Sequence, residues 1–241
     1  MYMSKIELKI NKKPDIKQCT FLCDNQLAEH LNNYDLTKFI NSSGSANLLC
    51  GKPGQGKTSL LYSLFESKDL LKKCYETIWI FQPSTSRASM KDKLFEKLPP
   101  SQLFDELTEE NLNVVMSSLD GKHNVAIIFD DVTTSLKDPK ILKQLKTLLM
   151  NRRHLHASCF FLSQTFKSVP KELRKLFTNI FLFRVSKDTL NDIFDEILEH
   201  KKEDILAISK LVFNKPYQYL FINTDSQRLF KNFDEIIINE E

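Results

Sequence analysis

Short runs of consecutive apolar residues alternate with amphipathic stretches along most of this chain. Runs of this length, rich in β-branched and aromatic residues, predict buried strands, and they cover residues 47–50, 76–81, 125–129, 159–162 and 179–185. Between them, apolar residues recur at the three-and-four spacing of helices over residues 58–67, 91–97, 108–119 and 139–150. Continuous apolar strands that alternate with helices predict a three-layer α/β fold, in which a mostly parallel sheet is covered on both faces.

The two ends of the chain follow other patterns. Two further helices are expected at residues 187–199 and 203–213, and then a β-hairpin whose strands, 217–222 and 227–230, flank a four-residue turn. The first 45 residues hold a strand-like alternation at 5–10, a loosely helical stretch and a turn-rich segment before residue 46. We therefore predict an N-terminal appendage, residues 1–45, and one large domain, residues 46–241.

Three of the five glycines of the chain lie within six residues, at Gly51, Gly54 and Gly56, and they lead directly into Lys57 and Thr58. This segment satisfies G-x-x-x-x-G-K-[ST], and it has the required strand before it and helix after it. Glycine lets such a loop aim its backbone N–H groups at phosphate oxygens, and the following helix points its positive end at the same anion. The segment predicts a nucleoside triphosphate site formed by Gly51, Lys52, Pro53, Gly54, Gln55, Gly56, Lys57, Thr58 and Ser59.

Polar side chains also follow two of the expected strands. Asp130 and Asp131 end the third strand and Gln164 follows the fourth, so all three are expected at the sheet edge where parallel strands bind ligands. Lys57 would neutralise the outer phosphates, and the Thr58 hydroxyl and Asp130 would hold Mg²⁺. Asp131 would orient and deprotonate the attacking water, and Gln164 would contact that water and the γ-phosphate. The alternatives are that Asp131 caps the next turn and that Gln164 only satisfies backbone groups.

Composition limits the class of protein. The chain has 241 residues, of which 41% are hydrophobic, and it has neither an apolar run long enough to cross a bilayer nor a signal-peptide core. Its five cysteines are odd in number and scattered, which is typical of reduced thiols in a cytosol-like compartment, and Cys19 with Cys23 lacks a second ligand pair for a metal. The net charge of +3 permits a polyanionic partner without requiring one.

Taken in order, these motifs are similar to those of a known family. The phosphate loop, the strand at 78–81, the Asp130-Asp131 strand, and Arg153-His154 before a strand that ends in Ser163-Gln164 resemble the poxvirus-type DNA-packaging ATPases of the FtsK-HerA superfamily. The resemblance covers about residues 47–233, including the closing segments 219–222 and 228–233. It implies an additional-strand, RecA/FtsK-like P-loop NTPase.

The resemblance also implies a function and partners. Such a protein is an ATP- and Mg²⁺-dependent motor that pumps double-stranded DNA into a preformed capsid. It works as a homo-oligomeric ring, a hexamer or pentamer, at a capsid or portal vertex in the host-cell cytoplasm, without a membrane partner. Arg152 and Arg153 become candidates for an arginine finger that reaches a neighbouring subunit's nucleotide. Their alternative role is a basic helix end, where cations are favourable. Asp131 departs from the superfamily, which often places a glutamate there.

Other functions are weighed against this one. A GTPase would need D-x-x-G after the Mg²⁺ aspartate and a transporter ATPase an L-S-G-G-Q-like segment, and the sequence has neither. A small-molecule kinase and a nucleotide-gated assembly protein without turnover stay open, although pure binding needs neither Asp131 nor Gln164. Candidate DNA contacts lie in the polar stretch 83–93, at Ser84, Thr85, Ser86, Arg87, Ser89, Lys91 and Lys93, and in a second cluster, Lys167, Lys171, Arg174 and Lys175. Either group is also typical of an ordinary solvated face.

Overall fold

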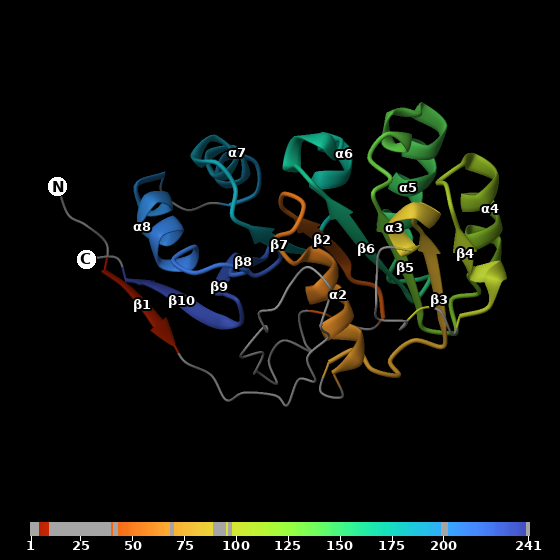
Figure 1. Ribbon diagram of the computed structural model, residues 1–241, viewed down its shortest axis with the longest axis horizontal. Coiled ribbons are helices and arrows are strands. Elements are labelled where there is room, and N and C mark those ends of the chain that lie inside the picture. Colours follow the sequence, from red (N-terminus) through yellow and green to blue (C-terminus); the bar gives the residue numbers. More distant parts are fainter. Residues whose placement is uncertain are drawn as a thin grey trace.

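A ten-stranded sheet runs through the molecule in the order β1-β10-β9-β8-β7-β2-β6-β5-β3-β4 (Figure 1). This computed structural model describes residues 5–9, 40, 43–67, 70–88, 95, 98–198 and 202–239. The strands are β1 (Lys5–Lys9), β2 (Ala46–Cys50), β3 (Thr77–Phe81), β4 (Leu103–Phe104), β5 (Val125–Asp130), β6 (Ala157–Ser163), β7 (Asn179–Phe183), β8 (Tyr219–Asn223), β9 (Arg228–Lys231) and β10 (Asp234–Asn239). The five strands predicted from apolar runs are all present.

The sheet has a parallel and an antiparallel part. Neighbouring strands from β7 through β2, β6, β5 and β3 to β4 pair in parallel, and β7 through β8, β9 and β10 to β1 pair antiparallel. The predicted hairpin is thus confirmed as β8 and β9, and β10 extends it. The strand predicted near the start of the chain is also present as β1, and it joins the main sheet by pairing with β10. Residues 10–39, which include Cys19 and Cys23, lie outside the described residues.

Helices cover both faces of the sheet, as the predicted three-layer fold requires (Figure 1). On one face lies α2 (Lys57–Glu66), and apolar residues of α4, α5, α7 and α8 pack against the other. The bounds are α4 (Glu109–Ser118), α5 (Pro139–Asn151), α6 (Lys171–Arg174), α7 (Lys187–Ile197) and α8 (Lys202–Val212). Helix α5 starts where expected because Pro139 occupies its first turn and the Asp138 carboxylate accepts from the Lys140 N–H at 2.8 Å.

Aromatic rings fill the parallel part of the core. Phe81, Phe129 and Phe161, from three neighbouring strands, stack in a row with ring centroids 5.2 and 4.3 Å apart. The free thiols of Cys50 and Cys159 are buried among the strands. Within the described residues, no helix is both long enough and apolar enough to cross a membrane.

Buried amides mark the boundary between the parallel and the antiparallel part. Asn179 donates from Nδ2 to Asn47 Oδ1 at 2.9 Å, and Asn223 donates to Asn179 Oδ1, also at 2.9 Å. Asn47 in turn donates to the Ser45 hydroxyl at 2.8 Å. A buried polar chain of this kind is stable only in one alignment, so it fixes the register of β2, β7 and β8.

Some elements were not expected. The polar stretch at 83–93 begins with the short helix α3 (Ser84–Ala88), and β4 and α6 follow no clear sequence pattern. The helix predicted at 91–97 falls almost wholly outside the described residues. The strand between the phosphate-loop strand and the Asp130 strand is β6, and β3 lies beyond β5.

Candidate functional site

The phosphate loop, residues 51–56, connects β2 to α2 in a conformation that glycine makes possible. Gly56 precedes α2 with φ 95°, in the left-handed region that side chains disfavour. At Gly51 a Cβ atom would lie 2.6 Å from the Cβ of Phe183, so only glycine lets the loop cross β7 this closely. The glycines thus serve both the curvature of the loop and its packing on the sheet.

Lys57 is the first residue of α2, and its ammonium group lies inside the curve of the loop. Its Nζ donates to the carbonyl oxygens of Gly51, at 2.7 Å, and of Lys52, at 3.1 Å. Burial lowers the pKa of Lys57, and the charges of Asp130 and Asp131 oppose that shift. The two carboxylates therefore lie close enough to Lys57 to act on its charge.

Strand register brings the predicted site residues to one edge of the sheet. Strand β6 lies between β2 and β5 and pairs Ser163 with Cys50 and Leu162 with Asp130. The Gly51 N–H continues this ladder by donating to the Ser163 carbonyl at 3.1 Å. The phosphate loop, Gln164 and the two aspartates consequently begin at the carboxyl ends of three neighbouring strands, where a ligand of a parallel sheet is expected.

Asp130 is held by a residue that the sequence analysis did not single out. Gln82, a buried residue just after β3, donates from Nε2 to Asp130 Oδ2 at 2.7 Å. Burial raises the pKa of Asp130 to about 6, while the hydrogen bond from Gln82 lowers it. The rule that selected Gln164, a polar side chain directly after an apolar strand, also selects Gln82.

Asp131 and Gln164 are both exposed at this edge. Asp131 has φ 57°, so the chain turns sharply as it leaves β5. The next short helix, η2 (Ser135–Lys137), is preceded by Thr134, so Asp131 does not cap it. Around Gln164, the Thr165 carbonyl oxygen accepts from the Ser163 hydroxyl at 2.9 Å and from the Ser168 hydroxyl at 2.7 Å, and the two hydroxyls lie 2.8 Å apart, which ties the turn together.

The oxygen-bearing side chains at this edge suit a magnesium ion as ligands. Mg²⁺ prefers oxygen ligands and usually keeps several waters, so it needs only one or two protein groups beside phosphate oxygens. The hydroxyl of Thr58, in the first turn of α2, and the carboxylate of Asp130 are such groups. A cation there would also favour the ionised form of Asp130, which burial disfavours. Within the described residues, no cluster of three or more His, Cys, Asp or Glu side chains offers a site for a more demanding metal.

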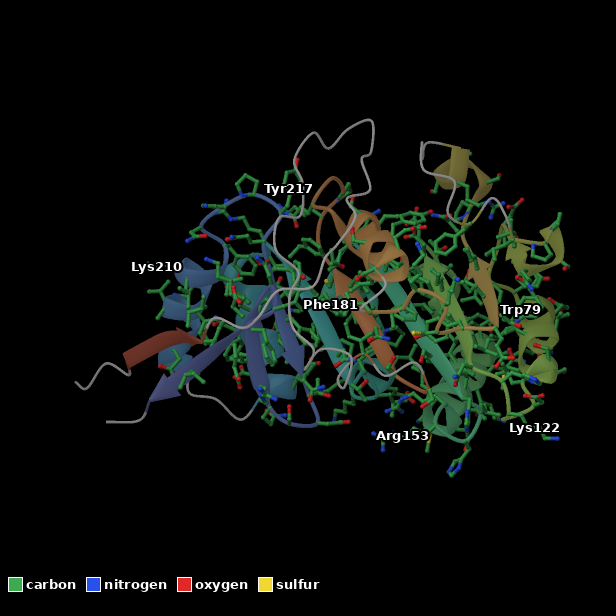
Figure 2. All side chains as sticks on the ribbon, turned by 90° about the horizontal axis from the view of Figure 1, so that it is seen from below. Trp79, Lys122, Arg153, Phe181, Lys210 and Tyr217 are labelled. Carbon is green, nitrogen blue, oxygen red and sulfur yellow. The ribbon has the colours of Figure 1, made fainter. Side chains whose placement is uncertain are left out.

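Arg153 lies at the opposite edge of the sheet (Figure 2), and Arg152 is the residue before it, at the end of α5. They follow α5 and precede β6, and the Arg152 carbonyl accepts from the Ala157 N–H at 2.9 Å. Arg153 is exposed and donates to Asp225, whereas Arg152 is half-buried and donates to the Leu149 carbonyl at 2.6 Å. The five residues of β2 span about 16 Å, so neither guanidinium reaches the phosphate loop of its own chain.

Three candidate DNA contacts are engaged within the protein, and one of them is Lys167, whose Nζ pairs with Asp192 at 2.7 Å. Arg87 on α3 pairs with Asp105 and donates to the Gln82 carbonyl. Arg174 is only 8% exposed, lies 4.6 Å over the Phe166 ring and pairs with Glu196, so it is not part of a solvated basic face. Ser84, Thr85, Lys171 and Lys175 are exposed, and Ser89, Lys91 and Lys93 lie outside the described residues.

Fold and site together define a P-loop ATPase of the additional-strand class, because β6 is inserted between the phosphate-loop strand and the aspartate strand. The sequence model of the poxvirus A32 protein family matches residues 45–237, and the chain belongs to that family. No individual curated protein sequence matches the chain.

Solved structures with the same fold include viral packaging ATPases. The DNA-packaging ATPase B204 from Sulfolobus turreted icosahedral virus is 17% identical, with a TM-score of 0.59 over 77% of this chain and 95% of that one. The genome packaging NTPase B204 from Sulfolobus turreted icosahedral virus 2, in complex with ATP-gammaS, is 16% identical, with a TM-score of 0.60 over 79% and 97%. The cytoplasmic domain of the type VII secretion ATPase EccC from Thermomonospora curvata is 11% identical, with a TM-score of 0.53 over 90% and 25%.

Proposed function

We propose that this protein is an ATP-hydrolysing motor that moves double-stranded viral DNA into a preformed capsid. Membership of the poxvirus A32 protein family supports the proposal, and the fold shared with packaging ATPases agrees with it. The observation that carries it is the common edge formed by the phosphate loop, Asp130, Asp131 and Gln164. A site that only bound nucleotide would not need the last two groups.

In this proposal each residue of the edge has one task. The backbone N–H groups of residues 51–58 and the Lys57 ammonium hold the phosphates, with Lys57 exchanging its loop carbonyls for phosphate oxygens. Thr58 and Asp130 hold Mg²⁺, which when bound neutralises charge on the phosphate oxygens. Gln82 keeps the Asp130 carboxylate in place.

Asp131 and Gln164 act on the attacking water. The Asp131 carboxylate accepts a proton from that water, and the Gln164 amide orients the water toward the γ-phosphate. Asp131 is one methylene shorter than glutamate, and the sharp turn at its φ of 57° sets where the carboxylate points as the chain leaves β5.

Arg153 is the proposed arginine finger for the nucleotide of a neighbouring subunit. It lies too far from its own phosphate loop to serve it, and it is exposed, which a contact in trans requires. Arg152 is less suited because its guanidinium is half-buried against the Leu149 carbonyl. A finger in trans requires a homo-oligomer, so we propose a ring, and on the strength of the family membership we propose that it docks on a capsid or portal vertex in the cytoplasm of the host cell.

ATP hydrolysis measured with and without double-stranded DNA, over a range of protein concentrations, tests the proposal. Stimulation by DNA together with an onset that depends on protein concentration is the expected result, because a ring must assemble before Arg153 can act. Turnover only with a small-molecule acceptor would instead indicate a kinase. Tight ATP binding without hydrolysis at any concentration, with or without DNA, would indicate an assembly protein.

A further inference from the structure

A cavity of about 300 Å³ lies beside the phosphate loop. Gly54 and Gln55 of the loop form one wall, Phe183 and Arg184 at the end of β7 form another, and residues 214–218, between α8 and β8, close it. This volume is at the lower end of the range for small-molecule sites. Because the cavity shares two residues with the loop, whatever is attached to a phosphate chain in the loop can extend into it.

Tyr217 brings an aromatic ring to this place by an unusual backbone conformation. Its φ is 61°, in the left-handed region that bulky residues rarely adopt, and such conformations concentrate at ligand sites. Its Cδ1 lies 3.6 Å from where a Cβ on Gly56 would be, so the ring sits against the start of α2. Figure 2 shows Tyr217 beside the phosphate loop, at the edge opposite Arg153. The position suits a platform for a planar base.

Gln218, the next residue along the chain, supplies an unused polar group. Its side-chain Oε1 is buried and has no hydrogen-bond partner among the residues that the structure describes, and Gln218 lines the cavity. A buried amide oxygen without a hydrogen-bond partner destabilises the folded protein, unless a bound ligand donates the missing hydrogen bond. An amide both accepts and donates, which matches the adenine edge that carries the N6 amine and N7. Guanine offers two acceptors on the corresponding edge.

We propose that this cavity binds the adenosine half of ATP, with the Tyr217 ring packed on the base and the Gln218 amide selecting adenine over guanine. The inference rests on the proposed function, since it takes ATP to be the ligand of the phosphate loop. Arg184 borders the same cavity and is held there by its Nη2, which donates to the Phe213 carbonyl at 3.2 Å. The phosphate loop thus provides affinity for any triphosphate, and residues 214–218 provide the choice of base.

Equilibrium binding of ATP, GTP and inorganic tripolyphosphate, each with Mg²⁺, tests this division of roles. The wild-type protein should bind ATP about tenfold more tightly than GTP. Gln218→Leu, which keeps the size of the side chain, should weaken ATP about tenfold and leave tripolyphosphate unchanged. Tyr217→Gly, which removes the ring but accepts the same φ, should weaken ATP about 10- to 100-fold, whereas Tyr217→Phe should retain ATP binding.

Gln144→Leu is the matched control. Its Oε1 is also buried without a partner among the described residues, but it lies on α5, outside the residues that line the cavity. This variant should bind all three ligands as the wild type does. Unfolding midpoints of every variant show that the binding losses are not losses of fold.

The outcomes separate this inference from the proposed function. If the wild-type protein binds neither ATP nor tripolyphosphate, the proposed function fails. If it binds ATP and GTP equally, adenine selection by Gln218 is refuted, whatever the variants do. If Tyr217→Gly and Gln218→Leu bind ATP as tightly as the wild type, or lose ATP and tripolyphosphate together, the cavity is not the base site, while the proposed function stands.

Discussion

Asp130 should destabilise the metal-free protein, so that Asp130→Asn makes it more stable at the cost of its function. Burial raises the pKa of this carboxyl from 3.8 to about 6. A carboxyl that binds its proton more tightly in the folded than in the unfolded chain lowers stability as the pH rises above its unfolded-state pKa, and the loss is complete above the folded-state pKa. The difference between the unfolded-state and the folded-state pKa amounts to a loss of about 3 kcal/mol in unfolding free energy near pH 8. The partial exposure of Asp130 reduces this loss to about 1–3 kcal/mol.

The Asp130→Asn substitution removes the charge but keeps an acceptor for the hydrogen bond from Gln82. Gln82 Nε2 donates to Asp130 Oδ2 at 2.7 Å, and the amide oxygen of asparagine can accept the same bond. Asp131→Asn is the matched control, because Asp131 is adjacent but exposed, and removal of its charge should change stability by less than about 0.5 kcal/mol.

Urea unfolding in the presence of a metal chelator measures the effect. Near pH 8, Asp130→Asn should exceed the wild type by about 1–3 kcal/mol, which is about 2–10 °C in melting temperature. The advantage should shrink as the pH falls below about 6, because the wild-type carboxyl then takes up its proton. An Asp130→Asn protein that is no more stable than the wild type near pH 8, or whose advantage does not change with pH, would refute the reasoning.

Three further predictions concern catalysis and folding. Asp131→Asn should bind ATP within about threefold of the wild type but hydrolyse it at least about 100-fold more slowly, and normal turnover would remove Asp131 from the mechanism. Arg153→Ala should also hydrolyse ATP slowly. A mixture of Arg153→Ala with Asp131→Asn should recover activity, because Asp131→Asn subunits supply Arg153 to neighbouring Arg153→Ala subunits that keep Asp131. A mixture that stays inactive would contradict a finger in trans. Asn179→Ala should cost about 2–4 kcal/mol in urea unfolding because it leaves the amides of Asn47 and Asn223 without their buried partner, and a loss below about 1 kcal/mol would show that this chain of bonds matters little.

Much of the parallel half of the fold follows from local pattern. The strands β2, β5, β6 and β7 are continuous apolar runs, and buried parallel strands need no other signal. The phosphate loop is just as local, since its glycines, lysine and threonine are consecutive. The strand order is not local: β6 follows β5 in the chain but lies between β2 and β5 in the sheet.

The missed features depend on contacts between distant residues. The two-residue strand β4 exists only because Ile80 and Phe81 lie beside it. The position of Gln82 directly after an apolar strand marks it as an edge residue, but its partner Asp130 lies 48 positions away and only the folded sheet brings the two together. Tyr217 could not be found because a positive φ at a tyrosine is imposed by its surroundings and not by its own preference.

The pairing of β1 with β10 has a practical consequence for anyone who shortens this chain. Strand β10 carries three consecutive isoleucines, Ile236, Ile237 and Ile238, and residues 5–9 complete its outer row of main-chain hydrogen bonds. Deleting the first nine residues would make β10 an exposed, apolar edge strand, with which strands of other molecules can pair. Affinity tags are therefore better attached ahead of residue 1 than substituted for the opening segment, if the preparation is to stay free of aggregates.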